Sequence, residues 1–259
     1  MRKNVVRFLL ILALIFAVFR LRSQSQKNDG VFEADAAVST IAIEDKNIQV
    51  QVIGTDRKKD SLTVYYQENQ QNDYDISLKR EHLVIQKRNR PFNFLFSWLN
   101  FDFTDRTLVI EIPQQQLDSL DLETTNGKVL IENLEVEKAK INTTNGEIKI
   151  NNSNFSDYLE SETTNGKVLL EDNEIADGTI ETTNGKVIFA NLAITNSLSV
   201  ETTNATVSGD IVGHQKDFEI TSKTTNAKSN LPKNSSNSAK KILEIETTNG
   251  SIMVDFTKD

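Results

Sequence analysis

The sequence of 259 residues contains no cysteine. Disulfide bonds, thiol nucleophiles and thiolate metal sites are therefore excluded. The two histidines, His82 and His214, are accompanied by no serine or cysteine motif, so neither is expected to act as a catalytic base. The chain also lacks a glycine-rich phosphate loop, a His-Glu-x-x-His motif and the Gly-Gly-x-Gly-x-Asp calcium repeat. We predict no catalytic residue, no cofactor and no metal.

A concentrated basic patch is missing as well. The formal net charge is −8, and the lysines are spread along the chain. Nucleic-acid binding needs clustered positive charge on one face. The charge pattern therefore argues against nucleic acid as a partner.

Long apolar runs are confined to the N-terminus, where Phe8 to Phe19 is unbroken and lies between Arg7 and Arg20. This run has the length of a signal-peptide core, but residues 5–21 reach the lower limit for a membrane span if both arginines extend to the interfaces. No Ala-x-Ala site follows. We predict an uncleaved signal anchor, and cleavage near Ser25 is the alternative. The expected product is a single-pass cell-membrane protein whose C-terminal domain is extracytoplasmic.

The rest of the chain is organised by a Thr-Thr-Asn motif, which continues as Gly-Lys-Val in three of its seven copies. Its asparagines recur every 19 to 23 residues, at Asn126, Asn145, Asn165, Asn184, Asn204, Asn226 and Asn249. A nearly constant period of this size is typical of repeat proteins, in which each unit buries its apolar side only against its neighbours. In most copies the residues four before and three after the asparagine are apolar, as in Leu122 and Val129, and they alternate with polar residues. Period-two alternation indicates strands on both sides of a corner.

Two arrangements fit this pattern. Each Asn-Gly could form the type I′ turn of a hairpin, or each repeat could be one coil of a β-solenoid with the asparagine at its corner. Alanine replaces the glycine at Ala205 and Ala227, whereas the asparagine is present in all seven copies. A I′ turn resists alanine where positive φ is required. We therefore favour coils in which the seven amides face the apolar side and form a hydrogen-bonded structural ladder.

The predicted fold class is all-β: a single-stranded β-solenoid (β-helix) of about 20 residues per coil, preceded by an N-terminal membrane helix. The expected organisation is a signal anchor over 1–22, a linker over 23–30, an irregular β-region over 31–117 that starts and caps the solenoid, and the repeat solenoid over 118–259.

A glutamate column precedes the corners and includes Glu162, Glu181 and Glu201. A solvated face is the simpler interpretation, because a single column lacks the crowded oxygen cage of a calcium site. A cation site between these three residues is the alternative.

The densest aromatic cluster follows Lys87, Arg88 and Arg90. It contains Phe92, Phe94, Phe96, Trp98, Phe101 and Phe103. Aromatic rings beside basic residues suit a loop that contacts a membrane interface or a partner. The alternative is a long hairpin whose rings fold over the body of the protein, and exposure would separate the two.

The export segment, the strand-rich start and the recurring Thr-Thr-Asn-Gly together resemble the bacterial β-strand repeat family known as "putative adhesins", which includes LiaG-like proteins encoded beside cell-envelope stress systems. The resemblance covers about residues 31–259 and implies an envelope location, with no catalytic or ligand residue to transfer. We predict a non-enzymatic, membrane-anchored binding or structural module tied to envelope stress. Besides the membrane, the expected partner is another envelope protein or a cell-wall polymer. The alternative is a carbohydrate-active enzyme, either a polysaccharide lyase or a hydrolase.

Overall fold

The computed structural model describes residues 28–56, 62–68, 73–88, 106–114, 116–235 and 239–258. Within these ranges the chain is built of strands, and its one helix is the short 3₁₀ turn η2 (Gln215–Asp217). The strands of the first part are β1 (Asn28–Ala34), β2 (Thr40–Asp45), β3 (Ile48–Thr55), β4 (Leu62–Glu68), β5 (Asp73–Lys79), β6 (His82–Arg88) and β7 (Arg106–Pro113). The repeats form β8 (Gln116–Thr124), β9 (Val129–Glu132), β10 (Glu135–Thr143), β11 (Ile148–Asn151), β12 (Asn154–Thr163), β13 (Val168–Glu171), β14 (Glu174–Thr182), β15 (Val187–Thr202), β16 (Val207–Ile211), β17 (Phe218–Thr224), β18 (Asn234–Ser235), β19 (Lys241–Thr247) and β20 (Ile252–Phe256).

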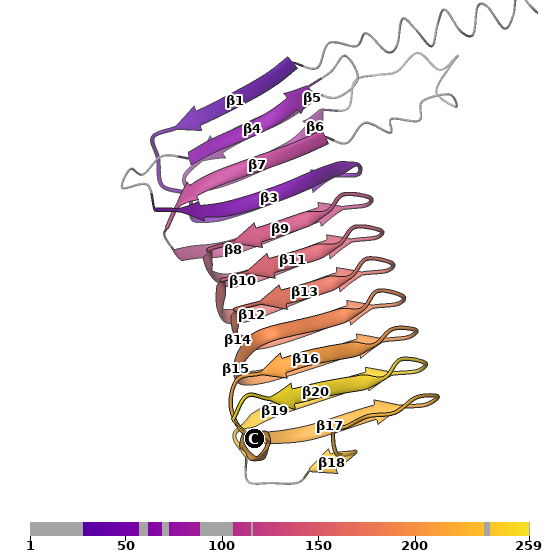
Figure 1. Ribbon diagram of the computed structural model, residues 1–259. Coiled ribbons are helices and arrows are strands. Elements are labelled where there is room, and N and C mark those ends of the chain that lie inside the picture. The colour runs from indigo at the N-terminus through magenta and orange to yellow at the C-terminus, as the bar shows by residue number, and fades with distance from the viewer. Residues whose placement is uncertain are drawn as a thin grey trace, which may run out of the picture.

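All 20 strands belong to one hydrogen-bonded sheet, which folds back over itself so that two halves face each other (Figure 1). We call them half A and half B. Half A runs in the order β1, β4, β7, β3, β9, β11, β13, β15, β16, β20. Half B runs β5, β6, β2, β8, β10, β12, β14, β15, β19, β17, β18. Each repeat except the sixth therefore gives one strand to each half, and β15 passes from one half to the other. The sixth repeat, with its corner at Asn226, gives β17 to half B and no strand to half A.

The predicted fold class, a single-stranded solenoid preceded by a membrane helix, is wrong. The spatial order departs from the chain order at both ends, because β2 lies between β6 and β8, and β19 lies between β15 and β17. The pairs β1–β4, β4–β7 and β5–β6 are antiparallel, which a single coil wound in one direction does not produce. The structure is a continuous all-β sheet closed around one core. The motif alone could not show this, because β1 to β7 lack it and because, at the other end, it does not specify that β19 pairs between β15 and β17.

The prediction of a single-pass membrane protein is also corrected. Nowhere in the described ranges does a helix reach the length and hydrophobicity needed to cross a bilayer. Residues 1–22, on which the predicted anchor rested, lie outside those ranges.

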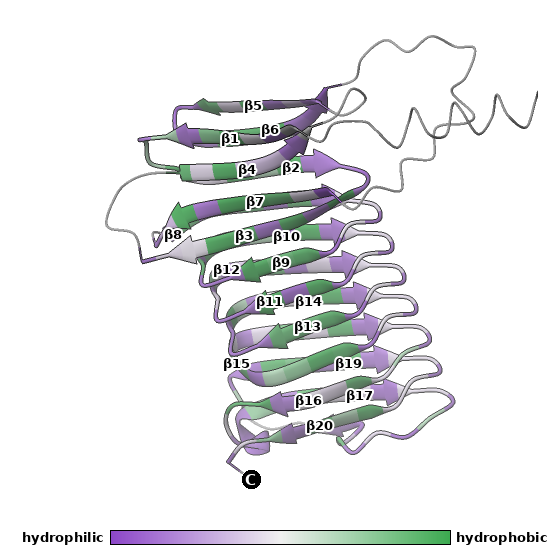
Figure 2. Ribbon diagram, turned by 45° about the horizontal axis from the view of Figure 1, so that its top comes forward, coloured by the Kyte–Doolittle hydropathy of each residue, from purple (hydrophilic) through white to green (hydrophobic). Residues whose placement is uncertain are grey.

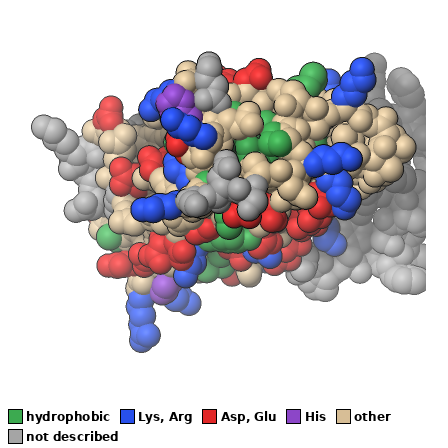
Figure 3. Space-filling view, turned by 90° about the horizontal axis from the view of Figure 1, so that it is seen from below, with side chains coloured by type: hydrophobic (Ala, Val, Ile, Leu, Met, Phe, Trp, Pro, Cys, Tyr) green, Lys and Arg blue, Asp and Glu red, His purple; other side chains and the backbone are tan. Residues whose placement is uncertain are grey.

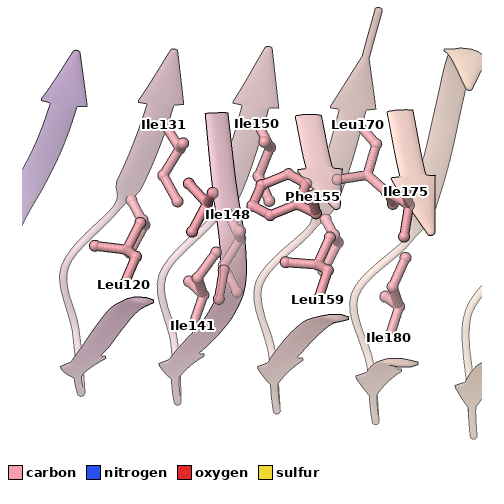
Figure 4. Close-up of a cluster of buried hydrophobic side chains, with 14 of the residues drawn as sticks. Leu120, Ile131, Ile141, Ile148, Ile150, Phe155, Leu159, Leu170, Ile175 and Ile180 are labelled. Atoms are coloured by element: carbon pink, nitrogen blue, oxygen red, sulfur yellow. The ribbon is translucent and has the colours of Figure 1, made fainter. Parts of the chain in front are cut away.

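The core follows directly from the alternation in the sequence (Figure 2). Side chains of both halves point inward and meet, as Figure 4 shows for Leu120, Ile131, Ile141, Ile148, Ile150, Phe155, Leu159, Leu170, Ile175 and Ile180. Each of these ten residues is at most 1% exposed. Burial of each large aliphatic side chain contributes about 1.5–3 kcal/mol of transfer free energy. One continuous hydrophobic cluster therefore holds the two halves together without disulfide bonds.

The repeat corners are shaped by a buried threonine and a glycine. Thr163 Oγ1 accepts a hydrogen bond from the Gly166 amide at 3.1 Å and donates to the carbonyl of Gly146 in the preceding repeat at 3.3 Å. A Cβ at Gly166 would lie 1.6 Å from that carbonyl oxygen. Gly166 is not among the residues with positive φ. Glycine is therefore required here by the close approach of two backbones, and not by a left-handed conformation.

Candidate functional site

The seven repeat asparagines stand side by side at the exposed edge of the corners. From Asn145 onward each side chain donates from Nδ2 to the Oδ1 of its neighbour in the stack. The donor and acceptor pairs are Asn145 to Asn126, Asn165 to Asn145, Asn184 to Asn165, Asn204 to Asn184, Asn249 to Asn204 and Asn226 to Asn249, at 2.6, 2.7, 2.7, 2.8, 2.7 and 2.7 Å. Asn126 donates in turn to Asn47 at 2.6 Å. We refer to these eight residues as the first ladder.

Two features of the first ladder differ from expectation. Its seven repeat asparagines are exposed, so the prediction that they face the apolar side together with the first threonine of each motif is wrong. The backbone turns at the corner, so alternation does not continue through it. Asn47 is an additional member, which the sequence did not reveal because Asp45 stands where the other repeats carry the inward threonine.

The corner at Ala205 shows what the glycine contributes. Thr202 Oγ1 is buried and has no hydrogen-bond partner within the described residues, whereas Thr182 Oγ1 accepts from the Gly185 amide at 3.0 Å. Because Ala205 carries a methyl group, its corner cannot approach the neighbouring backbone as closely as a glycine corner does. The substitution therefore leaves the local threonine unsatisfied while the asparagine ladder continues past it.

A second set of polar residues lines the opposite corners of the stack. Asn133, Asn152, Asp172 and Asn191 each have positive φ, between 44° and 58°. Asparagine and aspartate tolerate this conformation better than most residues. Asn152 Nδ2 donates to Asn133 Oδ1 at 2.7 Å, and Asn191 Nδ2 donates to Asp172 Oδ1 at 2.8 Å. We call these four residues the second ladder. Sequence reasoning missed it, although each member stands seven residues after a repeat asparagine.

A polar groove of about 680 Å³ runs along the second ladder. Its lining includes the four ladder residues together with Gln114, Asn154, Asn173, Glu135 and Glu174. The apolar contribution is limited to Leu134, Ala193 and Val212, and no aromatic or basic residue lines it within the described chain. The groove therefore presents amides and carboxylates along successive repeats.

The glutamate column lies on the outer face of half B, before the first-ladder corners. Register pairs Glu162 with Glu181, Glu181 with Glu201 and Glu201 with Glu246 on successive strands. A second groove of about 320 Å³ lies along these four residues and the neighbouring threonines. Partial burial raises the pKa of the Glu181 carboxyl above its usual value, and the negative charges of Glu201 and Glu162 raise it further.

The column ends in an ion pair, because Lys223 Nζ lies 3.0 Å from Glu246 Oε2. Both basic and acidic side chains lie at the surface of the end that carries the C-terminus, and many acidic ones lie toward the lower edge of the view (Figure 3). No group of three His, Cys, Asp or Glu residues within the described ranges has the geometry to hold a metal ion. The structure thus offers no cage for a cation between Glu162, Glu181 and Glu201.

The predicted partner or membrane contacts lie outside the described residues. They are Phe92, Phe94, Phe96, Trp98, Phe101 and Phe103. Of the histidines, His82 Nδ1 lies 2.6 Å from Thr40 Oγ1 at the surface.

A buried polar network at the N-terminal end was not predicted. Tyr74 donates its hydroxyl hydrogen to Asp45 Oδ2 at 2.6 Å, and Arg106 donates to the Tyr74 hydroxyl oxygen at 2.7 Å. Arg106 also lies 3.4 Å from Asp45 Oδ2. All three residues are buried, with exposed fractions of 2% for Arg106, 4% for Asp45 and 6% for Tyr74. Sequence alone could not find the network, because its members are separated by long stretches of chain.

Comparison with known proteins gives a family and several distant structures. The family described as Toastrack DUF4097 matches residues 38–258. A solved structure titled a "putative adhesin" from Bacteroides fragilis is 12% identical, with a TM-score of 0.44, and the match covers 89% of this chain and 99% of that one. A "putative lipid binding protein" from Parabacteroides distasonis is 13% identical, with a TM-score of 0.45, covering 89% and 98%. A "putative cell adhesion protein" from Clostridium sporogenes is 10% identical, with a TM-score of 0.40, covering 90% and 100%. No curated protein matches the chain.

Proposed function

This chain belongs to the Toastrack DUF4097 family, and from the surface that its repeats build we propose that it is a non-enzymatic binding module of adhesin-like character. The family membership confirms the resemblance predicted from the Thr-Thr-Asn-Gly repeat. Because family membership supplies no activity, the proposal rests on the surface itself.

The observation that carries the proposal is the repetition of identical polar side chains in register. The first ladder places one amide on each of eight neighbouring strand ends, and the glutamate column places carboxylates on neighbouring strands of half B. Neighbouring strands lie about 4.8 Å apart. A rigid array of this kind repeats the same weak contact many times, which suits an extended or repetitive partner, since linked contacts raise the overall affinity.

The partner that fits is a cell-wall polymer or another envelope protein. Rows of carboxylates on half B repel the phosphates of nucleic acids, which again disfavours that class of partner. A role in the envelope-stress response belongs to the same proposal. Its test is whether deletion of the gene changes the survival of cells exposed to a cell-wall antibiotic.

A carbohydrate-active enzyme is the competing function, and one observation favours it. Glu181 lies between Glu162 and Glu201 on adjacent strands, and its pKa is raised. Glycoside hydrolases use a neighbouring pair of carboxyl groups of which one has a raised pKa. The competing function predicts that Glu181 acts as a general acid in the groove on half B.

Binding of the full-length chain to insoluble polymers separates the two functions. The polymers are peptidoglycan, chitosan and cellulose, and the measurements are the fraction of protein retained and the release of new reducing ends. The proposal expects retention on at least one polymer with no new reducing ends. Release of reducing ends that is lost in Glu181→Gln would establish the enzyme instead, and absence of retention on all three polymers would refute the binding function.

A further inference from the structure

The second ladder is interrupted, whereas the first is continuous. In an unbroken row each amide donates to the residue before it, so Asn152 Oδ1 should accept from the residue at position 172. That residue is an aspartate, and its ionised carboxylate has no hydrogen to donate. Across the described chain, no donor reaches Asn152 Oδ1, and Asp172 accepts from Asn191 with Oδ1 alone. Asn152 and Asp172, which are neighbours in the second ladder, thus present free acceptor oxygens at the middle of the groove.

The charge of the groove also favours a ligand that donates hydrogen bonds. Glu135, Asp172 and Glu174 are exposed carboxylates in its lining, and no lysine or arginine of the described chain lines it. Asn133 and Asn154 add exposed or half-exposed amides, which can donate and accept. The groove is therefore rich in acceptors and negatively charged. It suits a ligand that donates many hydrogen bonds and carries positive charge, and it disfavours an anionic polymer.

The shape and composition distinguish a glycan from a peptide. Peptide recognition relies on a free strand edge, an apolar groove for a helix, aromatic-lined proline sites or side-chain pockets. The second ladder lies at corners between paired strands, and the apolar lining is confined to Leu134, Ala193 and Val212. Hydroxyl groups repeated along a chain match amides and carboxylates repeated along the corners.

We propose that the groove along Asn133, Asn152, Asp172 and Asn191 is a binding site for an amino-bearing polysaccharide, which uses its hydroxyl and ammonium groups to satisfy the acceptors left by the interrupted ladder. This inference rests on the proposed binding function and gives it a site and a ligand class. Asp172 is the central contact, and Glu135 and Glu174 flank the bound polysaccharide.

The interruption itself supplies a substitution that removes the site and keeps the fold. Asp172→Asn places an amide at position 172, so that Nδ2 donates to Asn152 Oδ1 and the second ladder becomes continuous. Asparagine tolerates the φ of 56° found at this position. The variant is expected to fold with unchanged or higher Tm, and it loses both the negative charge and the free acceptors.

The test measures binding of a β-1,4-linked glucosamine hexamer to the full-length protein by calorimetry. Wild type is expected to bind, Asp172→Asn at least tenfold more weakly, and Glu174→Gln several-fold more weakly. Asp118→Asn is the control, because it removes the same charge at an exposed position outside the groove lining, and its affinity should remain within twofold of wild type.

Three outcomes would overturn the assignment. Equal binding by wild type and Asp172→Asn would place the glycan elsewhere. Equal or tighter binding of a polygalacturonate oligomer would contradict the ligand class. Displacement of the glucosamine hexamer by hexalysine at lower concentration, dependent on Asp172, would assign the groove to a basic peptide. In each case retention of the protein on insoluble polymers could still occur, so the broader binding function is tested separately.

Discussion

At the scale of single residues, the repeat corners show that one side chain can serve several purposes at once. The inward threonine satisfies both the amide of its own glycine and the carbonyl of the neighbouring corner. A buried hydroxyl without partners costs about 1–3 kcal/mol. The glycine permits this arrangement by bringing two backbones together. The Thr-Thr-Asn-Gly motif therefore encodes contact between repeats as much as it encodes a turn.

Gly166→Ala should be destabilising for this reason. The new Cβ would lie 1.6 Å from the Gly146 carbonyl oxygen, so the corner must move away and Thr163 loses hydrogen bonds on both sides. We expect a loss of about 1–3 kcal/mol in the free energy of unfolding. Thermal unfolding followed by circular dichroism should show a Tm lower by roughly 3–10 °C.

Ala205→Gly is the matched control for that measurement. Glycine at this corner allows the close approach that Thr202 Oγ1 lacks, and this gain offsets the roughly 0.5–1 kcal/mol that glycine costs in chain entropy. The Tm should therefore stay unchanged or rise. A fall comparable to that of Gly166→Ala would contradict the role assigned to the corner contact.

At the scale of the elements, the first ladder connects neighbouring strand ends by side chains alone. Asn165 takes part in two hydrogen bonds of the ladder, whereas Asn226, at the end of the row, takes part in one. Each exposed bond contributes roughly 0.5–1.5 kcal/mol at most. We expect Asn165→Ala to lower the free energy of unfolding about twice as much as Asn226→Ala, as measured by urea denaturation. Equal losses would mean that the asparagines act through local backbone preference and not through the ladder.

The glutamate column makes the stability of half B depend on pH. The pKa of Glu181 is raised in the folded state, so the folded protein binds this proton more tightly than the unfolded chain. Stability should therefore fall as pH rises from the usual glutamate pKa of 4.5 through the raised value, and the loss persists above it. Glu181→Gln removes this loss. Because the side chain is largely exposed, solvent screening limits the gain at pH 7 to about 0.5 kcal/mol or less.

The measurement compares Tm at pH 4 and pH 7 for both proteins. The advantage of Glu181→Gln should be present at pH 7 and smaller at pH 4. Glu246→Gln serves as the control, because Glu246 pairs with Lys223 at 3.0 Å and its neutralisation removes an attraction. A stabilising effect of similar size in the control would show that overall net charge, and not the glutamate neighbours of Glu181, controls the pH dependence.

The same elements show how far sequence could predict the structure. Alternation around each asparagine identified the strands and the inward residues such as Ile141 and Ile148, because burial on one face imposes period two. The asparagine row followed from the constant residue at each corner. The position of the β2 and β3 strands beside β8 and β9 could not be predicted, since those strands lack the motif. The groove escaped prediction because its residues vary among Asn, Asp and Glu from repeat to repeat.

At the scale of the whole molecule, the two ends differ from the regular middle. A stack of parallel strands exposes unpaired backbone groups at each end unless other segments cover them. At the N-terminal end the antiparallel strands β1, β4 and β5 lie outermost, and at the other end the short strand β18 pairs with part of β17. The strands that depart from chain order therefore lie at the ends, where pairing by the repeat alone would leave edges open.

The buried Arg106 network should determine the stability of the N-terminal end. Removal of one partner from a buried ion pair leaves an uncompensated charge and costs about 3–5 kcal/mol. In Arg106→Leu, Asp45 keeps the hydroxyl hydrogen bond of Tyr74 but loses its cation. Because each repeat contacts only its neighbours, the loss should remain local. Hydrogen exchange followed by mass spectrometry should show faster exchange in β2, β3, β6 and β7, with little change from β12 to β16.

The control is the double variant Asp45→Asn, Arg106→Leu. It removes both charges and should recover part of the protection from exchange. Uniformly faster exchange along the whole stack would show that the N-terminal end and the repeats unfold as one unit. No recovery in the double variant would show that the network acts through packing alone.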